Sequence, residues 1–347
     1  TTSAMALPLG IVPEERLQKT LEAIVALHQD LGDRKNRHWA RLKYTLYALG
    51  DGDKEKGVKV FRKMAEDKIG TLDDPDPNYD FGIVNLHHGW MKQQSNGLFG
   101  YGIFLFGGRI INGPNGRIKD MLKNIIENYD APMMISPSQG IIISNIKSED
   151  KRYLEGDMER FGYQHTYGEK DELRRNSVAC VGLPTCPLAF THSETYLPEL
   201  IEQMEELGWG SMTARIGISA CDAQCSRPAT KEYGLVGVGK DIYMFKLMAD
   251  RREQGMPVID NDGNQYLGRV HRDGVPTVLN ALLQLYVIDK LPDETVGTFH
   301  RRVGLDHIIN HLKTNPATKE LMVPGKKKVT PYILNVYEQE ASLSASS

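Results

Sequence analysis

The sequence has few cysteines, no long apolar stretch and no excess of either charge. Four cysteines among 347 residues are too few for a disulfide scaffold and predict a reducing compartment, the cytoplasm or the plastid stroma of a eukaryote. No apolar run approaches the roughly 20 residues of a membrane-spanning helix, and residues 1–6 lack the pattern of a signal peptide. Lys and Arg number 42 against 45 Asp and Glu, which predicts no nucleic-acid or membrane partner.

The composition is that of a globular protein, with 40% apolar and 25% charged residues. The length predicts two or three domains. Apolar residues recur at helical spacing over 14–31 and again over 57–66. Between them, residues 34–49 read as a helix dense in cations. The turn-rich segment 73–78 marks a first domain boundary.

Two further units are predicted after this boundary. In the first, a strand at 99–111, a helix at 117–129, a strand pair within 133–146 and a helix at 148–162 suggest a compact α/β unit. The second begins near residue 166, with helices at 197–207 and 275–290, strands at 212–219 and 234–247, and a polar loop at 256–264. We expect the tail after 315, which includes the basic run 326–328, to be extended or poorly ordered.

The four cysteines form two close pairs in this last unit. Five residues separate Cys180 from Cys186, and three separate Cys221 from Cys225. Four thiolates suffice for one metal centre. Zinc sites usually have two to four intervening residues, whereas an iron–sulfur cluster is larger than one ion and admits wider loops. The spacing alone leaves open a cluster, a zinc site or unligated core cysteines.

The residues around the cysteines carry a family resemblance. The run NSVACVGLPTCPLA at 176–189, followed by CDAQCSRP at 221–228, closely resembles the signature of siroheme and [4Fe-4S] sulfite and nitrite reductases. Other segments match in order from about residue 7 to 312. They are GDRKNRHWARLKY at 32–44, GW at 89–90, GRI at 108–110, ISPSQ at 135–139, GLVG at 234–237 and FHRRVG at 299–304.

The resemblance implies a fold and a domain order. The fold class is α+β, with a ferredoxin-like sulfite/nitrite reductase repeat followed by an α/β domain that binds the cluster and siroheme. Residues 1–75 would be the helical C-terminal part of the central siroheme-binding domain and 76–165 the repeat. Residues 166–315 would be the cluster and siroheme domain, and 316–347 a tail. The chain would be the C-terminal half of an internally duplicated protein.

The resemblance also implies cofactors and chemistry. In the family, four cysteines bind one [4Fe-4S] cluster, here Cys180, Cys186, Cys221 and Cys225. The last one also bridges to the siroheme iron, so Cys225 would be the catalytic proximal ligand. Electrons from ferredoxin or a flavoprotein pass through the cluster to the haem, where sulfite is reduced to sulfide by six electrons in sulfur assimilation, or nitrite to ammonia.

Four other residues match cofactor-contacting positions of the family. Arg37 and Arg41 would face the siroheme carboxylates from one face of the predicted helix, four residues apart. Gln139 and Asn176 match polar positions near the cofactor. Without the resemblance, the two arginines read as a solvated basic face and the other two residues as local caps.

The chain departs from the family in three places. The usual Cys-Pro-Asn-Gly-Cys loop is Cys221-Asp-Ala-Gln-Cys225, so Ala223 replaces an amide donor, and Gly140 replaces the usual Asn after Gln139. The Lys-x-Lys strand that grips the substrate anion in the family's first half has no counterpart. Activity would therefore need a complementary N-terminal half or a second subunit.

Other functions are also consistent with the sequence. A ferredoxin-type nitrite reductase is the closest alternative. A non-catalytic iron–sulfur electron-transfer subunit without siroheme, or a structural zinc domain, would use the same cysteines. The histidines form no second ligand cluster, and Gly107-Gly108 and Gly237-x-Gly239 lack the strand–GxGxxG–helix context of a dinucleotide site.

Overall fold

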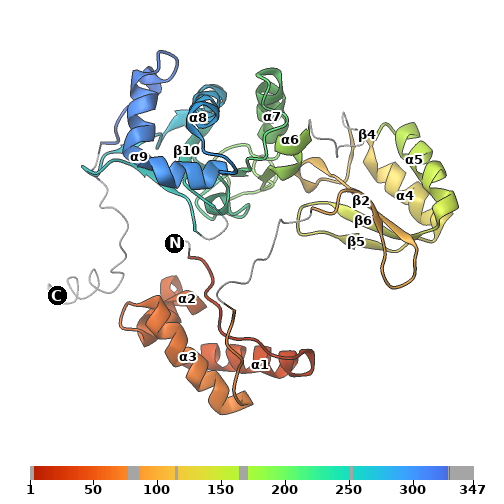
Figure 1. The fold of residues 1–347 in the computed structure, drawn as a ribbon, viewed down its shortest axis with the longest axis horizontal. Coiled ribbons are helices and arrows are strands. Elements are labelled where there is room, and N and C mark those ends of the chain that lie inside the picture. The colour runs from red at the N-terminus through yellow and green to blue at the C-terminus, as the bar shows by residue number, and fades with distance from the viewer. Residues whose placement is uncertain are drawn as a thin grey trace. The chain divides into compact units, whose positions relative to one another are not determined.

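The computed structural model describes residues 4–76, 86–113, 116–163, 171–250, 253–326 and 328. The chain divides into two compact units, one of residues 1–84 with 330–347 and the other of residues 85–329. Figure 1 shows a helical first unit and a second unit that contains both sheets and helices. No helix in the described ranges is long and apolar enough to cross a membrane.

In its described residues, the first unit has three helices and a short 3-10 turn. Helix α1 (Glu14–Leu31) begins with two acidic residues, which favour a helix N-terminus. The turn η1 (Arg37–Trp39) and helix α2 (Leu42–Leu49) follow. Asp53 caps α3 (Lys54–Ile69) by accepting from the Glu55 and Lys56 amides. Helices α2 and α3 cross closely at Gly57, because glycine has no Cβ. A Cβ there would lie 1.8 Å from the Leu46 carbonyl oxygen.

The predicted helix over 34–49 is wrong in its first half. The Asp33 carboxylate accepts from the amides of Lys35 and Asn36, each at 2.8 Å, and this turn competes with helix. Arg37 lies in η1, and Arg41 is the extended residue that precedes α2. The two arginines therefore do not share one face of a helix.

The second unit begins with a four-stranded antiparallel sheet in the order β1-β2-β6-β5. Its strands are β1 (Gly89–Lys92), β2 (Phe99–Ile103), β5 (Met133–Ile135) and β6 (Ile141–Ile146). Helices α4 (Ile118–Tyr129) and α5 (Lys151–Arg160, after η3, Ser148–Asp150) cover one face of this sheet (Figure 1) and bury a shared apolar core. The turn η2 (Phe106–Gly108) and the small hairpin β3 (Asn112–Gly113) and β4 (Gly116–Arg117) connect the sheet to α4.

A larger sheet forms the rest of this unit, in the order β12-β11-β10-β9-β8-β7, with β13 paired to β10. Its strands are β7 (Val178–Ala179), β8 (Ile216–Ser219), β9 (Tyr233–Gly239), β10 (Ile242–Leu247), β11 (Met256–Ile259), β12 (Gln265–Tyr266) and β13 (Val270–His271). Strands β7, β8 and β9 are parallel and the others antiparallel.

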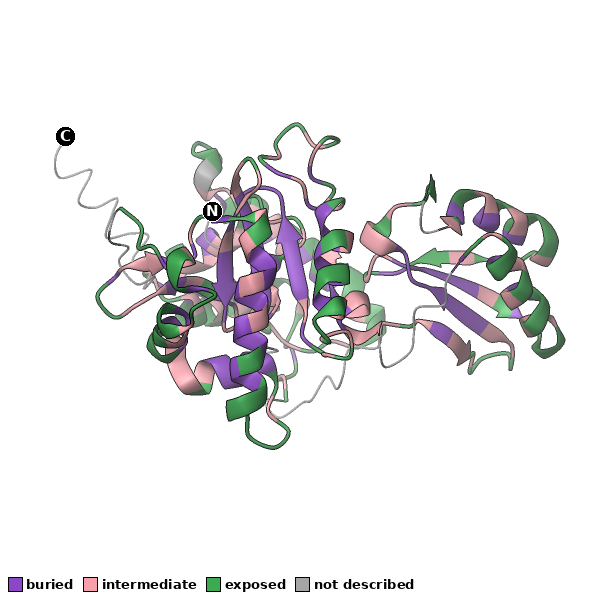
Figure 2. Ribbon diagram, turned by 90° about the horizontal axis from the view of Figure 1, so that it is seen from above, coloured by how far each residue is buried: buried purple, intermediate pink, exposed green. Residues whose placement is uncertain are grey.

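The helices of this part pack on the larger sheet through one apolar core. They are α7 (Tyr196–Glu206), α8 (Val275–Asp289) and α9 (Val296–Thr314), while α6 (Glu172–Asn176) precedes β7. Short 3-10 turns lie at η5 (Pro228–Thr230), η6 (Arg272–Gly274) and η7 (Lys319–Leu321). Figure 2 shows buried residues concentrated on the strands and on the inner helix faces. The two sheets with their helices confirm the α+β class.

Three features of this unit differ from what the sequence analysis gives. Residues 256–259 form strand β11 instead of a polar loop, because Val258 is fully buried. Helix α9 was not predicted, and its apolar pattern is interrupted at Gly304, where φ is 79°. The start of the tail packs, since Thr318 and Met322 are buried; the tail from 329 lies outside the described residues, as does part of the basic run 326–328.

Candidate functional site

The two cysteine pairs follow two neighbouring parallel strands. Cys180 comes directly after β7, and Cys221 comes two residues after the end of β8. The two strands pair in parallel, with Val178 opposite Gly217. Because the carboxyl ends of parallel strands meet at the same edge of a sheet, both cysteine loops leave the sheet at one place, where α/β folds commonly bind ligands.

Direct hydrogen bonds join the two loops at this edge. The Cys180 amide donates to the Ile218 carbonyl at 3.0 Å, and the Ala220 amide donates to the Cys180 sulfur at 3.2 Å. The Phe190 amide donates to the Ala220 carbonyl at 2.9 Å. Ala220 thus binds the first loop through both of its backbone groups. An N–H donor aimed at a sulfur stabilises negative charge there.

The second loop then turns back over the sheet. The Ser226 hydroxyl donates to the Ile218 carbonyl at 2.8 Å, and the Ser226 amide donates to Ser219 Oγ at 3.1 Å. Within the loop, the Gln224 amide donates to the Cys221 carbonyl at 3.3 Å. These bonds fix the segment that carries Cys225 against β8.

Glycines make room for this segment on the sheet. Successive side chains of a strand point to opposite faces of the sheet. The side chains of Ile218 and Leu235 belong to the apolar core between the larger sheet and its helices. A Cβ on Gly217 would lie 2.6 Å from Lys231 Cγ, and one on Gly234 would lie 2.4 Å from the Pro228 carbonyl oxygen. The chain after Cys225 can therefore lie directly on the face of the sheet opposite the helices.

The four thiols differ in exposure. Cys221 is buried, Cys180 and Cys186 are half-buried, and Cys225 is exposed; none forms a disulfide. Burial raises the pKa of the Cys221 thiol, the hydrogen bond from the Ala223 backbone opposes this, and the neighbouring Cys180 and Cys225 add to the rise in pKa. These three thiols are therefore close enough to influence one another.

A tight single-ion site is not formed by these cysteines. Among the residues that the structure describes, no three side chains of His, Cys, Asp or Glu converge closely enough to hold a metal ion.

The antiparallel-sheet part of the same unit contacts the first cysteine loop at both ends. Gln139 Nε2 donates to the Ala179 carbonyl at 3.0 Å, directly before Cys180. Arg109 donates to both carboxylate oxygens of Glu194, each at 2.7 Å, and to Thr185 Oγ1 at 3.3 Å. The structure therefore places the predicted Gln139 beside the loop. In the sequence, Arg109 stands out only as part of the GRI segment at 108–110, and no sequence signal marks its partner Glu194.

The remaining predicted residue of this unit has a local partner. Asn176 Nδ2 donates to the backbone carbonyl and the carboxylate of Glu172, so it closes its own short helix. Arg37 and Arg41 belong to the first unit.

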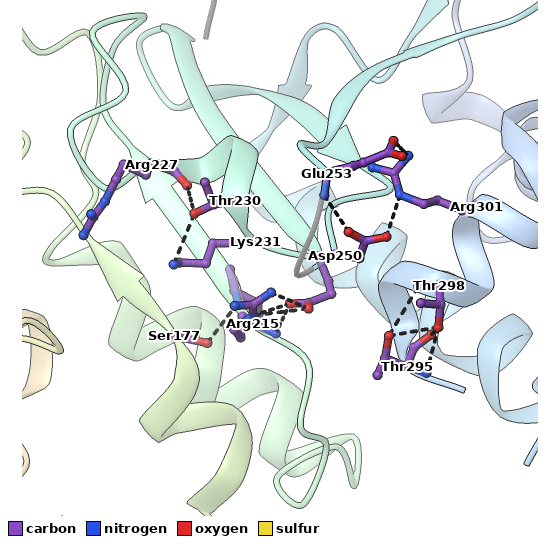
Figure 3. Close-up of polar contacts among 12 residues, drawn as sticks. Ser177, Arg215, Arg227, Thr230, Lys231, Asp250, Glu253, Thr295, Thr298 and Arg301 are labelled. Atoms are coloured by element: carbon purple, nitrogen blue, oxygen red, sulfur yellow. Dashed lines mark hydrogen bonds and ion pairs between the residues drawn. The ribbon is translucent and has the colours of Figure 1, made fainter. Parts of the chain in front are cut away.

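A group of cations that the sequence did not suggest follows Cys225. Figure 3 shows Arg227, Thr230 and Lys231 on this segment, near Arg215. Arg215 pairs with Glu232, whereas Arg227 and Lys231 make no ion pair within the described ranges. Burial, with smaller contributions from the neighbouring Arg215 and Arg227, lowers the pKa of Lys231 to about 8. An anionic group would relieve the repulsion among these cations.

Comparison with known proteins gives three kinds of match. The nitrite and sulphite reductase 4Fe-4S domain matches residues 1–69. The sulfite reductase [NADPH] hemoprotein beta-component of Nitrobacter hamburgensis is 31% identical over 308 residues, which are 88% of this chain and 51% of that protein. The same component of Nitrosomonas europaea is 30% identical over 306 residues, covering 86% and 49%.

A solved structure shares the fold. The NirA protein of Mycobacterium tuberculosis superposes with a TM-score of 0.71 and 20% identity, covering 87% of this chain and 55% of that one. The chain spans about half the length of the curated relatives that it matches. The sequence matches confirm the family resemblance that the cysteine motifs carry: the chain is similar to the nitrite and sulphite reductase family over about half the length of those relatives.

Proposed function

We propose that this chain is the cluster-binding half of a sulfite reductase, in which Cys180, Cys186, Cys221 and Cys225 hold one [4Fe-4S] cluster. The observation that carries the proposal is the pair of cysteine loops at one sheet edge, joined through Ala220. The domain assignment belongs to the same proposal: residues 1–75 to the siroheme-binding domain, 76–165 to the repeat, and 166–315 to the cluster domain. The family-model match covers residues 1–69, close to the bounds of the first of these domains.

The chemistry of the site suits these cofactors. When bound, the cluster stores single electrons and siroheme holds the anion that receives them. The exposed thiol of Cys225 is the one suited to bridge from the cluster to the siroheme iron, because the other three are more buried. The Ala220 amide, which donates to the Cys180 sulfur at 3.2 Å, stabilises thiolate charge.

Cations and amides would bind the cofactor carboxylates. We assign this role to Arg37, Arg41, Gln139 and Asn176, and add Arg227 because it is exposed and has no carboxylate partner within the described residues. A guanidinium pairs well with a carboxylate through two parallel hydrogen bonds.

The reaction, the donor and the compartment complete the proposal. The substrate is sulfite, reduced to sulfide by six electrons, and the names of the sulfite reductase relatives favour it over nitrite. Electrons would come from ferredoxin or a flavoprotein, and the substrate-gripping cations from a complementary half or second subunit. The cytoplasm or the plastid stroma would suit the low cysteine content.

One observation favours a second function, electron transfer through a cluster without siroheme. Ala223 lies between Cys221 and Cys225 and has a methyl group in place of the amide donor usual in the family's loop. A side chain without a donor contributes no hydrogen bond to a carboxylate.

Reconstitution of the full chain with iron, sulfide and siroheme under anaerobic conditions tests the proposal. We expect about four iron atoms per chain and sharp siroheme absorption bands in the visible spectrum. Cys186→Ser should lower the iron content, and Cys225→Ser should also remove the electronic coupling between cluster and siroheme. Absence of iron would refute the proposal, and iron without siroheme bands would favour the electron-transfer function.

The arginine assignment has a matched control on the same segment. Arg41→Gln should weaken siroheme retention. Arg34→Gln should not, because Arg34 donates to the His28 and Gln29 carbonyls and has no assigned role. Equal retention in both variants would remove Arg41 from the site. Paired turnover assays with sulfite and nitrite, with the complementary half supplied, test the substrate.

A further inference from the structure

Lys246 is a buried cation next to the second cysteine loop. It lies on β10 between Phe245 and Leu247, both of which are fully buried in the helical core. Because side chains alternate along a strand, Lys246 faces the opposite side of the sheet, where the loop after Cys225 lies. The residue is only 7% exposed.

The aliphatic part of the Lys246 side chain has space on that side. Its Cβ is 3.2 Å from the place where a Cβ on Gly234 would lie, and Lys246 pairs with Gly234 across the β9–β10 ladder. The glycine thus makes space for the side chain beside the Pro228 segment. The ammonium ends at Gln224, donating to Oε1 at 2.9 Å.

This ammonium has no carboxylate partner among the residues that the structure describes. Buried charges in proteins are normally paired, because removal of an ion from water costs several kcal/mol. Burial lowers the pKa of Lys246. The neutral Gln224 amide satisfies one donor but leaves the charge uncompensated.

Gln224 links this charge to the cysteines. It is the residue before Cys225, and its φ of 56° lies in the left-handed region that favours glycine. Its amide donates to the Cys221 carbonyl, and its own carbonyl accepts from the Arg227 amide at 2.8 Å. A side chain is retained at a position suited to glycine, and that side chain is the acceptor for Lys246.

We propose that Lys246 is a positioning residue of the cluster site, which holds the Cys221–Cys225 loop through Gln224 and supplies a positive charge to the thiolates bound there. The inference rests on the proposed function, since a cluster held by four thiolates is an anion. Reduction adds a further negative charge, so a nearby buried cation favours the reduced state. The lysine charge that is uncompensated in the protein alone would then be balanced.

The test compares Lys246→Met, Lys246→Arg and Gln224→Gly in the full chain. Lys246→Met has similar length and no charge, and we expect the midpoint potential of the reconstituted cluster to fall. A tenfold change in the reduction equilibrium corresponds to about 59 mV for one electron, and we expect a fall of about this size. Lys246→Arg should keep the potential near that of the unchanged chain. Gln224→Gly should retain the charge but release iron to a chelator faster.

A second readout uses the cluster-free protein. Replacement of a buried unpaired charge by an apolar group is neutral or stabilising, so Lys246→Met should unfold at the same or a higher temperature than the unchanged chain. The control is Lys313→Met, which removes an exposed lysine that donates to the Tyr266 hydroxyl at 2.8 Å. It should leave the potential unchanged.

The outcomes separate this inference from the proposed function. If the chain binds a cluster and Lys246→Met has an unchanged potential, the inference is wrong and the proposed function stands. A lower unfolding temperature of cluster-free Lys246→Met, without a change in potential, would assign the lysine to the fold alone. If the unchanged chain binds no cluster, both are overturned.

Discussion

Gly237 is where a single added methyl group would disturb both cysteine loops. It is buried on β9. A Cβ there would lie 2.4 Å from the Ala220 carbonyl oxygen and 2.6 Å from Thr191 Cγ2. The first of these neighbours is backbone, which cannot rotate away. Ala220 accepts from Phe190 and donates to the Cys180 sulfur, so its displacement would move the groups that join the two loops.

The expected cost of Gly237→Ala follows from this overlap. Overpacking of a well-filled site costs about 1–3 kcal/mol of unfolding free energy. For a unit of this size, each kcal/mol corresponds to roughly 2–4 °C in Tm, which gives a fall of roughly 2–12 °C. Iron retention should fall as well, because the Ala220 amide would no longer be aimed at Cys180.

Circular dichroism melting of the cluster-free chain measures the first effect, and iron content after reconstitution measures the second. The matched control is Gly156→Ala in α5, where a Cβ would meet no atom within 4 Å. Alanine is the better helix former by roughly 0.5–1 kcal/mol, so this variant should be as stable as the unchanged chain or more so. If Gly237→Ala melted at the temperature of the unchanged chain and kept its iron, the close approach of the loops would be refuted.

Two further predictions concern the same unit. Arg109→Ala should lower the free energy of unfolding by about 1–2 kcal/mol, because it removes the two hydrogen bonds to Glu194. Glu194→Gln should lower it by a similar amount. If the losses of the two variants added up in the double variant, a shared interaction would be contradicted. Burial lowers the pKa of His300 to about 4, from an ordinary value of 6.5, so the unfolded chain takes up a proton first as the pH falls. The free energy of unfolding should therefore fall as the pH is lowered from about 6.5 to about 4. Between pH 6.5 and pH 5 the fall should be roughly 2 kcal/mol. His300→Leu should reduce this slope in denaturant titrations but not abolish it, since burial also lowers the pKa of His88 to about 4; an unchanged slope would exclude His300 as its source.

Regular elements with a strong local pattern were predictable from the sequence. The predicted helix over 14–31 has the same bounds as α1, and the helix predicted over 117–129 differs from α4 by one residue. Both have an unbroken apolar stripe, which is set by neighbours along the chain. The segment 34–49 failed because the Asp33 carboxylate makes a local turn, and α9 was missed because Gly304 breaks its pattern.

The cysteine loops were recognisable, but their support was not. Cysteine spacing and flanking residues are local, so they can be read directly. The contacts of Arg109 with Glu194 and of Lys246 with Gln224 join residues 85 and 22 positions apart. They depend on how segments distant in the sequence pack together, which no single segment encodes. A lysine between two apolar strand residues, as at 246, was the one available hint.

The central claim is that the four cysteine sulfurs surround one iron–sulfur cluster. A crystal structure of the anaerobically reconstituted full chain, with anomalous difference density recorded at the iron edge, tests this claim most directly. We predict one compact iron peak in contact with the sulfurs of Cys180, Cys186, Cys221 and Cys225. Iron at any other place, or no iron beside these sulfurs, would contradict the account.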